Sequence, residues 1–197
     1  MNNSRRLAIL LSIVLGMLVG CGTSPKKTNA PSLQHTEQVT IDQKHTELMQ
    51  RAIALMEKND ITAAEGYLHQ VVSSYPGFAP ALNNLALINY QRSRFSDAKR
   101  YIDQVLSFNS PAPNTFNLAG LIAVETGEYK MAQGYYEQAL QKSPSFANAH
   151  YNLALLYDMY FQNLPKAIQH YEFYVAAIPT VDEATQQWIE ELKRNVK

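Results

Sequence analysis

The sequence predicts an all-α protein built from repeated helix pairs. Three alanines, Ala64, Ala98 and Ala132, are spaced 34 residues apart, and Ala167 follows after 35. Apolar residues recur every three or four positions over residues 45–179, which is the spacing of one face of an α-helix rather than of a strand. A single helix pair cannot bury its own apolar face, so the period indicates several units that stack on one another.

Residues 1–20 have the layout of a secretory signal peptide. Arg5 and Arg6 precede an apolar run from Leu7 to Val19, and no acidic residue lies in this part of the chain. The run of 13 residues is shorter than a transmembrane helix, which needs roughly 20. The alternatives are an ordinary signal peptide followed by a chance cysteine, or a buried N-terminal helix.

The apolar run ends at Cys21, the only cysteine in the chain, which therefore has no partner for an intrachain disulfide. The segment Leu18-Val19-Gly20-Cys21 resembles the lipobox of bacterial lipoproteins. This resemblance implies that residues 1–20 are removed and that Cys21 carries a diacylglyceryl group and an N-acyl chain such as palmitate. Gly22 stands where an aspartate tends to retain such lipoproteins in the inner membrane, so we expect a lipid-anchored, periplasm-facing protein of the outer membrane.

Residues 21–44 are expected to form the lipidated cysteine and a flexible tether, because they are rich in Thr, Ser, Gln, Lys and Pro. Without residues 1–20, the chain has 15 basic and 17 acidic side chains. Nucleic-acid binding needs a surplus of basic residues, and the sequence provides none. We therefore expect proteins and the membrane as partners, and no nucleic acid.

Four repeats are predicted over residues 45–179, at about 45–78, 79–112, 113–146 and 147–180. The third shows the pattern most fully, with Phe116, Gly120, Ala132, Tyr136 and Pro144 at the expected spacings. This 34-residue unit resembles the tetratricopeptide repeat, in which two helices joined by a turn stack into a solenoid. The resemblance implies an all-α tetratricopeptide solenoid of four repeats whose first helices line a concave groove.

A closing helix is predicted over residues 181–197. Thr180 and Glu183 match a capping box, which would start this helix. One face of the helix carries Val181, Ala184, Trp188, Ile189 and Leu192. We expect Trp188 to pack against the fourth repeat, and the alternative is an exposed anchor for a partner.

The resemblance also implies a partner-binding groove lined by aliphatic, aromatic and amide side chains. By position in the repeats these are Met49, Gln50, Ile53, Asn83, Asn84, Leu87, Tyr90, Asn117, Leu121, Tyr151, Asn152 and Leu155. No lysine or arginine is among them, so we expect a partner helix or extended peptide held by burial and backbone hydrogen bonds, not an acidic tail. Two alternatives stay open: the asparagines pack helices together, and the aliphatic residues belong to the core. The orientation of Asn117 is also open, because it is one residue out of step with Asn84 and Asn152.

No nucleophile signature, phosphate loop or metal motif is recognisable, and the five histidines are scattered. We therefore expect no enzymatic activity, no cofactor and no metal. The chain resembles the pilotin-type tetratricopeptide lipoproteins of the bacterial envelope. This implies a membrane-anchored periplasmic scaffold for protein–protein interaction that assists assembly of a pilus or secretion secretin. The alternative is an adaptor that recruits or regulates peptidoglycan hydrolases or proteases.

Overall fold

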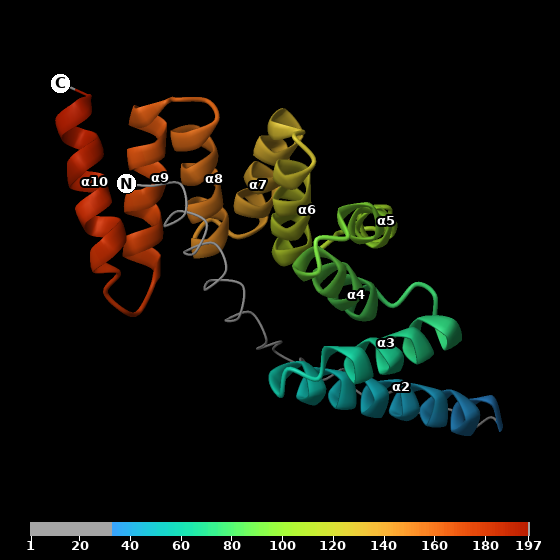
Figure 1. The fold of residues 1–197 in the computed structure, drawn as a ribbon. Coiled ribbons are helices and arrows are strands. Elements are labelled where there is room, and N and C mark those ends of the chain that lie inside the picture. The colour runs from blue at the N-terminus through green and yellow to red at the C-terminus, as the bar shows by residue number, and fades with distance from the viewer. Residues whose placement is uncertain (1–32, 197) are drawn as a thin grey trace. The chain divides into compact units, whose positions relative to one another are not determined.

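The computed structural model describes residues 33–196, with side chains from residue 43 onward. This part of the chain forms nine α-helices, α2 to α10, and no strand (Figure 1). No helix in it is both long enough and apolar enough to cross a bilayer. The signal peptide over residues 1–20, the lipidation of Cys21 and the first part of the tether lie outside the described residues and stay predictions.

The chain divides into two compact units, and the boundary between them in the sequence lies between Ser74 and Tyr75. The described part of the first unit is a pair of helices, α2 (Leu33–Glu57) and α3 (Ile61–Ser74), which pack against each other. Ala52 of α2 and Ala64 of α3 are fully buried, so both helices of the first repeat use small residues in the core.

Helix α2 begins earlier than the sequence predicted. Residues 33–44 were expected to belong to the tether, but they form the first turns of α2. Pro31 is the last helix-breaking residue before Gly66, and the intervening residues include many Glu, Gln, Lys and Leu with good helix propensity. The polar composition that suggested a tether is therefore equally that of an exposed helix.

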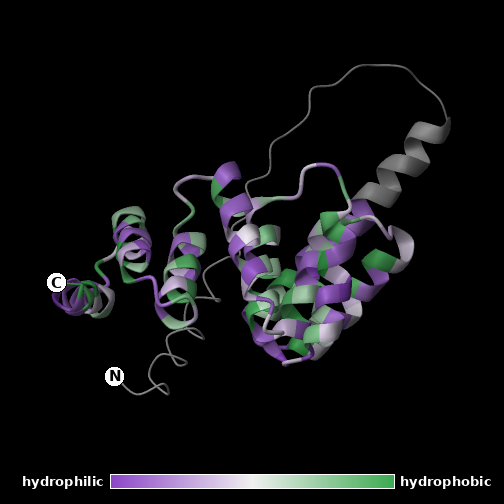
Figure 2. Cartoon of the chain, turned by 90° about the horizontal axis from the view of Figure 1, so that it is seen from above, coloured by the Kyte–Doolittle hydropathy of each residue, from purple (hydrophilic) through white to green (hydrophobic). Residues whose placement is uncertain are grey.

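The second unit contains the other three predicted repeats and the closing helix. Its helices are α4 (Ala79–Gln91), α5 (Phe95–Leu106), α6 (Pro113–Glu125), α7 (Tyr129–Lys142), α8 (Ala147–Met159), α9 (Leu164–Ala177) and α10 (Glu183–Asn195). They pack as the helix pairs α4 with α5, α6 with α7 and α8 with α9, and α10 packs on α9. The prediction of an all-α solenoid is confirmed. Figure 2 shows hydrophilic and hydrophobic residues interspersed along these helices, as expected for amphipathic helices.

The repeat period is visible in the backbone as well as in the sequence. A residue with positive φ ends the first helix of each repeat: Asn59 at 61°, Ser93 at 57°, Gly127 at 78° and Gln162 at 51°. The first three are 34 residues apart, and Gln162 follows after 35, where the fourth turn carries its extra residue. Left-handed backbone at this point reverses the chain within a few residues, so that the second helix can fold back on the first.

The core of the second unit depends on small residues at the helix crossings. The alanines whose spacing predicted the repeat are fully buried in this unit: Ala98, Ala132 and Ala167. Gly120 of α6 lies against the ring of Tyr136 of α7, and a Cβ atom at this glycine would overlap three ring atoms. Glycine at this point is therefore needed for close approach, because it lets the largest fully buried side chain of the described core lie directly on the backbone of α6.

The closing helix is present, but its start differs from the prediction. Asp182 caps it, accepting hydrogen bonds from the backbone N–H of Thr185 at 3.0 Å and from its hydroxyl at 2.7 Å. The predicted capping box of Thr180 and Glu183 is therefore wrong by two residues, and Val181 is 74% exposed instead of packed. Trp188 packs on the fourth repeat as expected, and its indole N–H donates to the Asp158 carboxylate at 2.8 Å.

Candidate functional site

The first helices of the repeats in the second unit, α4, α6 and α8, form its inner face. They contact one another across the repeats more than the outer helices α5, α7 and α9 do. Two amide hydrogen bonds tie them together: Asn83 Nδ2 donates to the Thr115 hydroxyl at 3.0 Å, and Asn152 Nδ2 donates to the side-chain Oδ1 of Asn117 at 2.9 Å. Both bonds join residues near the start of their helices, so α4, α6 and α8 run in the same direction.

The asparagines of the inner face divide into two kinds. Asn117 is 1% exposed and accepts its bond within the helix packing, so a ligand cannot reach it. Asn84 is partly exposed and Asn152 likewise, although Asn152 is also engaged with Asn117. The one-residue offset of Asn117 from Asn84 and Asn152 is therefore a difference in the direction of the side chain. Asn83 and Asn117 both hydrogen bond to a neighbouring helix, so helix packing explains their presence.

The aliphatic positions of the inner face are shared between the core and the surface. Leu87 and Leu121 pack against a buried cluster that includes Ala86, Ile102 and Ile122, and each keeps part of its surface exposed. Leu155 has the same intermediate exposure. These leucines are separated by steps of 34 residues, so one partly exposed leucine is offered by each inner helix.

The remaining predicted groove residues lie in different surroundings. Tyr151 is 4% exposed and contacts the ring of Tyr171 edge-on and the ring of Tyr174 at a tilt, so it belongs to the core of the fourth repeat. In the first unit, Met49 is buried, whereas Gln50 is exposed and Ile53 is partly exposed.

The C-terminal ends of the inner helices carry a cluster that the sequence reasoning did not assemble. We name Tyr90, Glu125, Tyr129 and Tyr160 the C-terminal rim. Tyr129 and Tyr160 stack with ring centroids 4.1 Å apart, and Tyr160 is 41% exposed. Burial raises the pKa of Tyr90, and the Glu125 carboxylate, which accepts a hydrogen bond from the Tyr90 hydroxyl, raises this pKa further. Burial and the neighbouring Tyr129 and Glu125 likewise raise the pKa of Tyr160.

A tetratricopeptide repeat family model matches residues 49–113 and 117–185. The chain belongs to the tetratricopeptide repeat family. The uncharacterized protein ycf37 of Pyropia yezoensis is 37% identical over 75 residues, which make up 38% of this chain and 42% of that protein. The match therefore spans less than half of that relative.

Solved structures of similar fold superimpose on most of the chain. MamA 41-end from Desulfovibrio magneticus RS-1 is 18% identical, with 77% of this chain and 85% of that chain covered and a TM-score of 0.65. YrrB, described as a TPR protein with an unusual peptide-binding site, is 14% identical, with 73% and 74% covered and a TM-score of 0.58. At these identities the similarity shows the fold alone.

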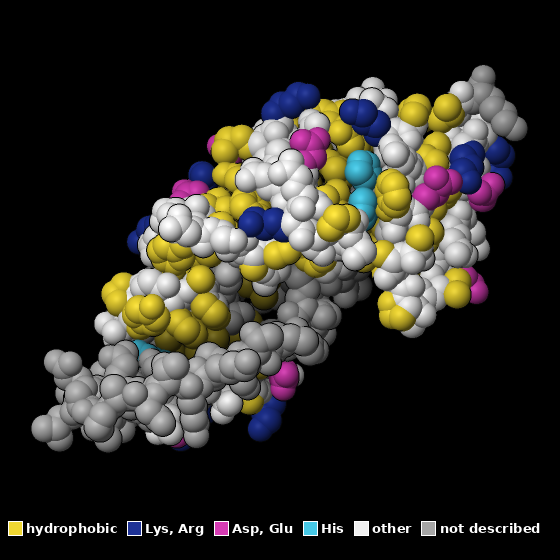
Figure 3. Space-filling model, turned by 180° about the vertical axis from the view of Figure 1, so that it is seen from behind, with side chains coloured by type: hydrophobic (Ala, Val, Ile, Leu, Met, Phe, Trp, Pro, Cys, Tyr) yellow, Lys and Arg dark blue, Asp and Glu magenta, His cyan; other side chains and the backbone are white. Residues whose placement is uncertain are grey.

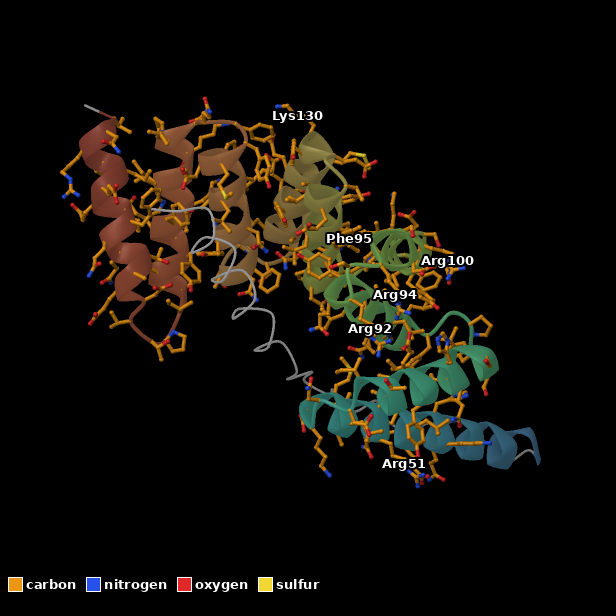
Figure 4. The ribbon with its side chains drawn as sticks, viewed as in Figure 1. Arg51, Arg92, Arg94, Phe95, Arg100 and Lys130 are labelled. Atoms are coloured by element: carbon orange, nitrogen blue, oxygen red, sulfur yellow. The ribbon has the colours of Figure 1, made fainter. Side chains whose placement is uncertain are left out.

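In this tetratricopeptide unit the basic residues lie outside the inner helices in sequence, although Arg92 is the C-cap of α4 and two lysines lie over inner-helix rings: Lys142 over Phe116 and Lys166 over Tyr157. Figure 4 shows Arg92, Arg94, Phe95 and Arg100 around the turn between α4 and α5 and along α5. On this outer helix, Arg100 pairs with Asp97 at 3.2 Å. The inner helices α4, α6 and α8 contain no lysine or arginine. An acidic tail would therefore find no cation on the inner helices themselves.

The fourth repeat of this tetratricopeptide unit contains a histidine pair that the sequence did not suggest. His150 Nε2–H donates to the carbonyl oxygen of Pro144 at 2.9 Å, because that oxygen can only accept. The Nδ1 atoms of His150 and His170 lie 3.0 Å apart, and the tautomers of the two rings set which of them donates. Figure 3 shows two adjoining histidine side chains beside hydrophobic ones at the surface. Burial, and next the neighbouring His150, lower the pKa of His170 to about 4, so the His170 ring is neutral at pH 7.

No group of three or more His, Cys, Asp or Glu side chains in the described part of the chain is arranged to hold a metal ion. The histidine pair has no third ligand beside it among the described residues, and the Nδ1 atoms of its two rings are already engaged in a hydrogen bond with each other. The absence of enzymatic activity and of a cofactor stays a prediction.

Proposed function

We propose that the chain is a lipid-anchored scaffold that binds a helix or extended peptide of an envelope protein on the inner face of its tetratricopeptide repeats. The tetratricopeptide repeats of this chain, and the peptide-binding site for which the similar structure YrrB is described, support the general role. The observation that carries the proposal is the row of partly exposed leucines, Leu87, Leu121 and Leu155, one on each inner helix. Burying their exposed surface against an apolar partner face would favour binding.

The polar groups beside this row fit a peptide ligand. Asn84 and Asn152 are partly exposed and flank the leucines, so their amides are placed to bond the backbone of an extended chain. The lack of cations on the inner helices favours an apolar or amphipathic segment over an acidic one.

The envelope location is inferred from the N-terminal sequence. A diacylglyceryl group together with an N-acyl chain at Cys21 would anchor the protein firmly, since two or more acyl chains suffice where one is marginal. Growth with an alkyne analogue of palmitate tests this: we expect labelling of the full chain and none of the Cys21→Ser variant. Unlabelled wild-type protein that is present in the envelope would refute lipidation.

Within this role, assembly of a pilus or secretion secretin is the partner process that we favour, on the resemblance to pilotin-type lipoproteins. Recruitment of peptidoglycan hydrolases or proteases is the second candidate. Photo-crosslinking in the native envelope distinguishes them, with the reactive residue at Leu87 of α4 and a matched control at Gln104, an exposed position of the outer helix α5.

A Leu87-specific adduct with a secretin or pilus subunit would support assembly, and an adduct with a cell-wall hydrolase would support the adaptor role. Equal adducts at Leu87 and Gln104, or none at Leu87 in folded protein, would show that the inner face is not the binding surface.

A further inference from the structure

The charges of the inner helices are few and are concentrated at one end. The helices α4, α6 and α8 contain two carboxylates, Glu125 and Asp158, and no lysine or arginine. Asp158 is engaged inside the fold, where it accepts from the Trp188 indole at 2.8 Å and from the Tyr171 hydroxyl at 3.3 Å. Glu125 is exposed and forms no ion pair within residues 43–196. Among the carboxylates of α4, α6 and α8, Glu125 is therefore the one that faces solvent without a cation.

The backbone adds negative potential at the same place. Tyr90, Glu125 and Tyr160 lie at the C-terminal ends of α4, α6 and α8, which run in the same direction. A helix C-terminus carries a partial negative charge, which a basic residue in the last turn often offsets. Helices α6 and α8 have no basic residue in the last turn or at the C-cap, whereas the C-cap of α4 is Arg92. The C-terminal rim therefore combines the ends of α6 and α8 with a carboxylate that forms no ion pair.

Aromatic rings surround this carboxylate. Tyr160 stacks on Tyr129 at 4.1 Å, and Tyr90 lies 5.8 Å from Phe95. A ring face attracts a lysine or arginine cation, and a nearby carboxylate strengthens this attraction. The exposed surface of Tyr160 and the exposed Glu125 leave this cation position open to a ligand.

The protein already places its own lysines on aromatic rings close by in the chain. Lys130, in the first turn of α7, lies 4.5 Å from the ring centroid of Phe161, and Lys166 lies 5.0 Å from that of Tyr157. Figure 4 shows Lys130 at the end of α7 next to the turn from α6. Neither lysine forms an ion pair with Glu125.

We propose that the C-terminal rim is a subsite for a lysine or arginine side chain of the peptide that binds the inner face. This inference rests on the proposed function and specifies its ligand: an apolar segment with one basic residue at the position that reaches Glu125. The cation would lie between the carboxylate and the exposed face of Tyr160, while the apolar part of the segment covers Leu87, Leu121 and Leu155.

The test is selection of random linear peptides displayed on phage against the full-length protein in detergent. We expect the enriched peptides to share a lysine or arginine at a fixed distance from their apolar residues. The Glu125→Gln variant should bind a selected peptide about threefold more weakly at low salt, because it loses an exposed ion pair while the cation–π contact with Tyr160 remains. Glu191→Gln is the matched control, because Glu191 is an exposed glutamate of α10 and its loss should leave affinity unchanged.

A second comparison separates this proposal from the proposed function. Replacing the basic residue of the selected peptide by norleucine should weaken binding to the wild type by more than Glu125→Gln does, because it also removes the cation–π contact. The same replacement should weaken binding to Glu125→Gln less than binding to the wild type. Asn84→Arg, which blocks the inner face, should abolish binding of every peptide. Selected peptides could fail to bind Asn84→Arg and yet share no basic residue, or bind Glu125→Gln as well as the wild type. Either result would overturn the rim subsite and leave the inner face as the binding surface. Failure to select any peptide would overturn both.

Discussion

Replacing Gly120 with alanine tests whether close helix approach sets the stability of the third repeat. A Cβ atom at Gly120 would lie nearer than 3.0 Å to three ring atoms of Tyr136. Tyr136 is 1% exposed and surrounded by packed helices, so its ring has no free space to enter. The expected result is a loss of unfolding free energy, although alanine is a better helix former than glycine.

The size of this loss follows from two opposing terms. Overpacking of a close-packed core costs about 1–3 kcal/mol, and the gain in helix propensity returns about 0.5–1 kcal/mol. The net loss is about 1–2 kcal/mol, which lowers the melting temperature by roughly 2–8 °C for a domain of this size. Thermal and urea unfolding followed by circular dichroism measures both quantities.

Gly134→Ala is the matched control. Gly134 lies within α7, and a Cβ atom there would meet no other atom within 4 Å. The same substitution should therefore stabilise the protein by about 0.5–1 kcal/mol. The double variant Gly120→Ala with Tyr136→Leu should be destabilised by less than the sum of its single variants, because leucine removes the ring atoms that clash. Equal stability of Gly120→Ala and Gly134→Ala would refute the close-approach argument.

Three further predictions concern polar groups of the second unit. Asn152→Ala leaves the buried carbonyl of Asn117 without its donor and should cost about 1–3 kcal/mol in urea unfolding, whereas replacing both by leucine should cost less; additive losses would contradict a direct bond. His170 has its pKa lowered to about 4 in the folded protein and binds a proton more readily when unfolded, so stability should fall as the pH drops from 6.5 towards 4 and stay level above 6.5. His170→Gln should flatten this part of the melting-temperature profile, and an unchanged slope would exclude the pair with His150 as its cause. Asp182→Ala removes the cap of α10 and should cost about 0.5–2 kcal/mol, measured as a lower melting temperature, whereas Thr180→Ala should have no effect.

The repeat architecture was predictable because its signal is both periodic and steric. Ala98, Ala132 and Ala167 recur at the period and are fully buried, so each small residue marks a helix crossing whatever the surrounding sequence. The spacing of the apolar residues then predicted α-helices rather than strands, and the 34-residue period predicted where the turns between them lie.

The features that the sequence did not predict are those for which two or more nearby residues are equally suited to the same role. Asp182 and Thr180 are both good N-cap residues, and only the packing of α10 on α9 selects Asp182. Asn117 and Asn152 belong to similar Asn-Leu-Ala triplets, yet one is buried and the other is partly exposed, because the frame of each helix decides which way the triplet faces. The C-terminal rim was missed for a related reason, since Tyr90, Glu125 and Tyr160 lie on three helices and come together only by stacking.

On the inner face, the apolar residues would provide binding affinity for a ligand, and the single carboxylate would fix its position. Leu87, Leu121 and Leu155 offer apolar surface of the same kind at every repeat, so burial against them changes little if an apolar segment slides along the row. A single charged contact at Glu125 lacks this tolerance, because a carboxylate and a cation attract strongly only at short distance. The rim contact would therefore contribute modestly to affinity but decide the register of the bound segment, and moving the basic residue of a selected peptide by one position should cost as much affinity as deleting it.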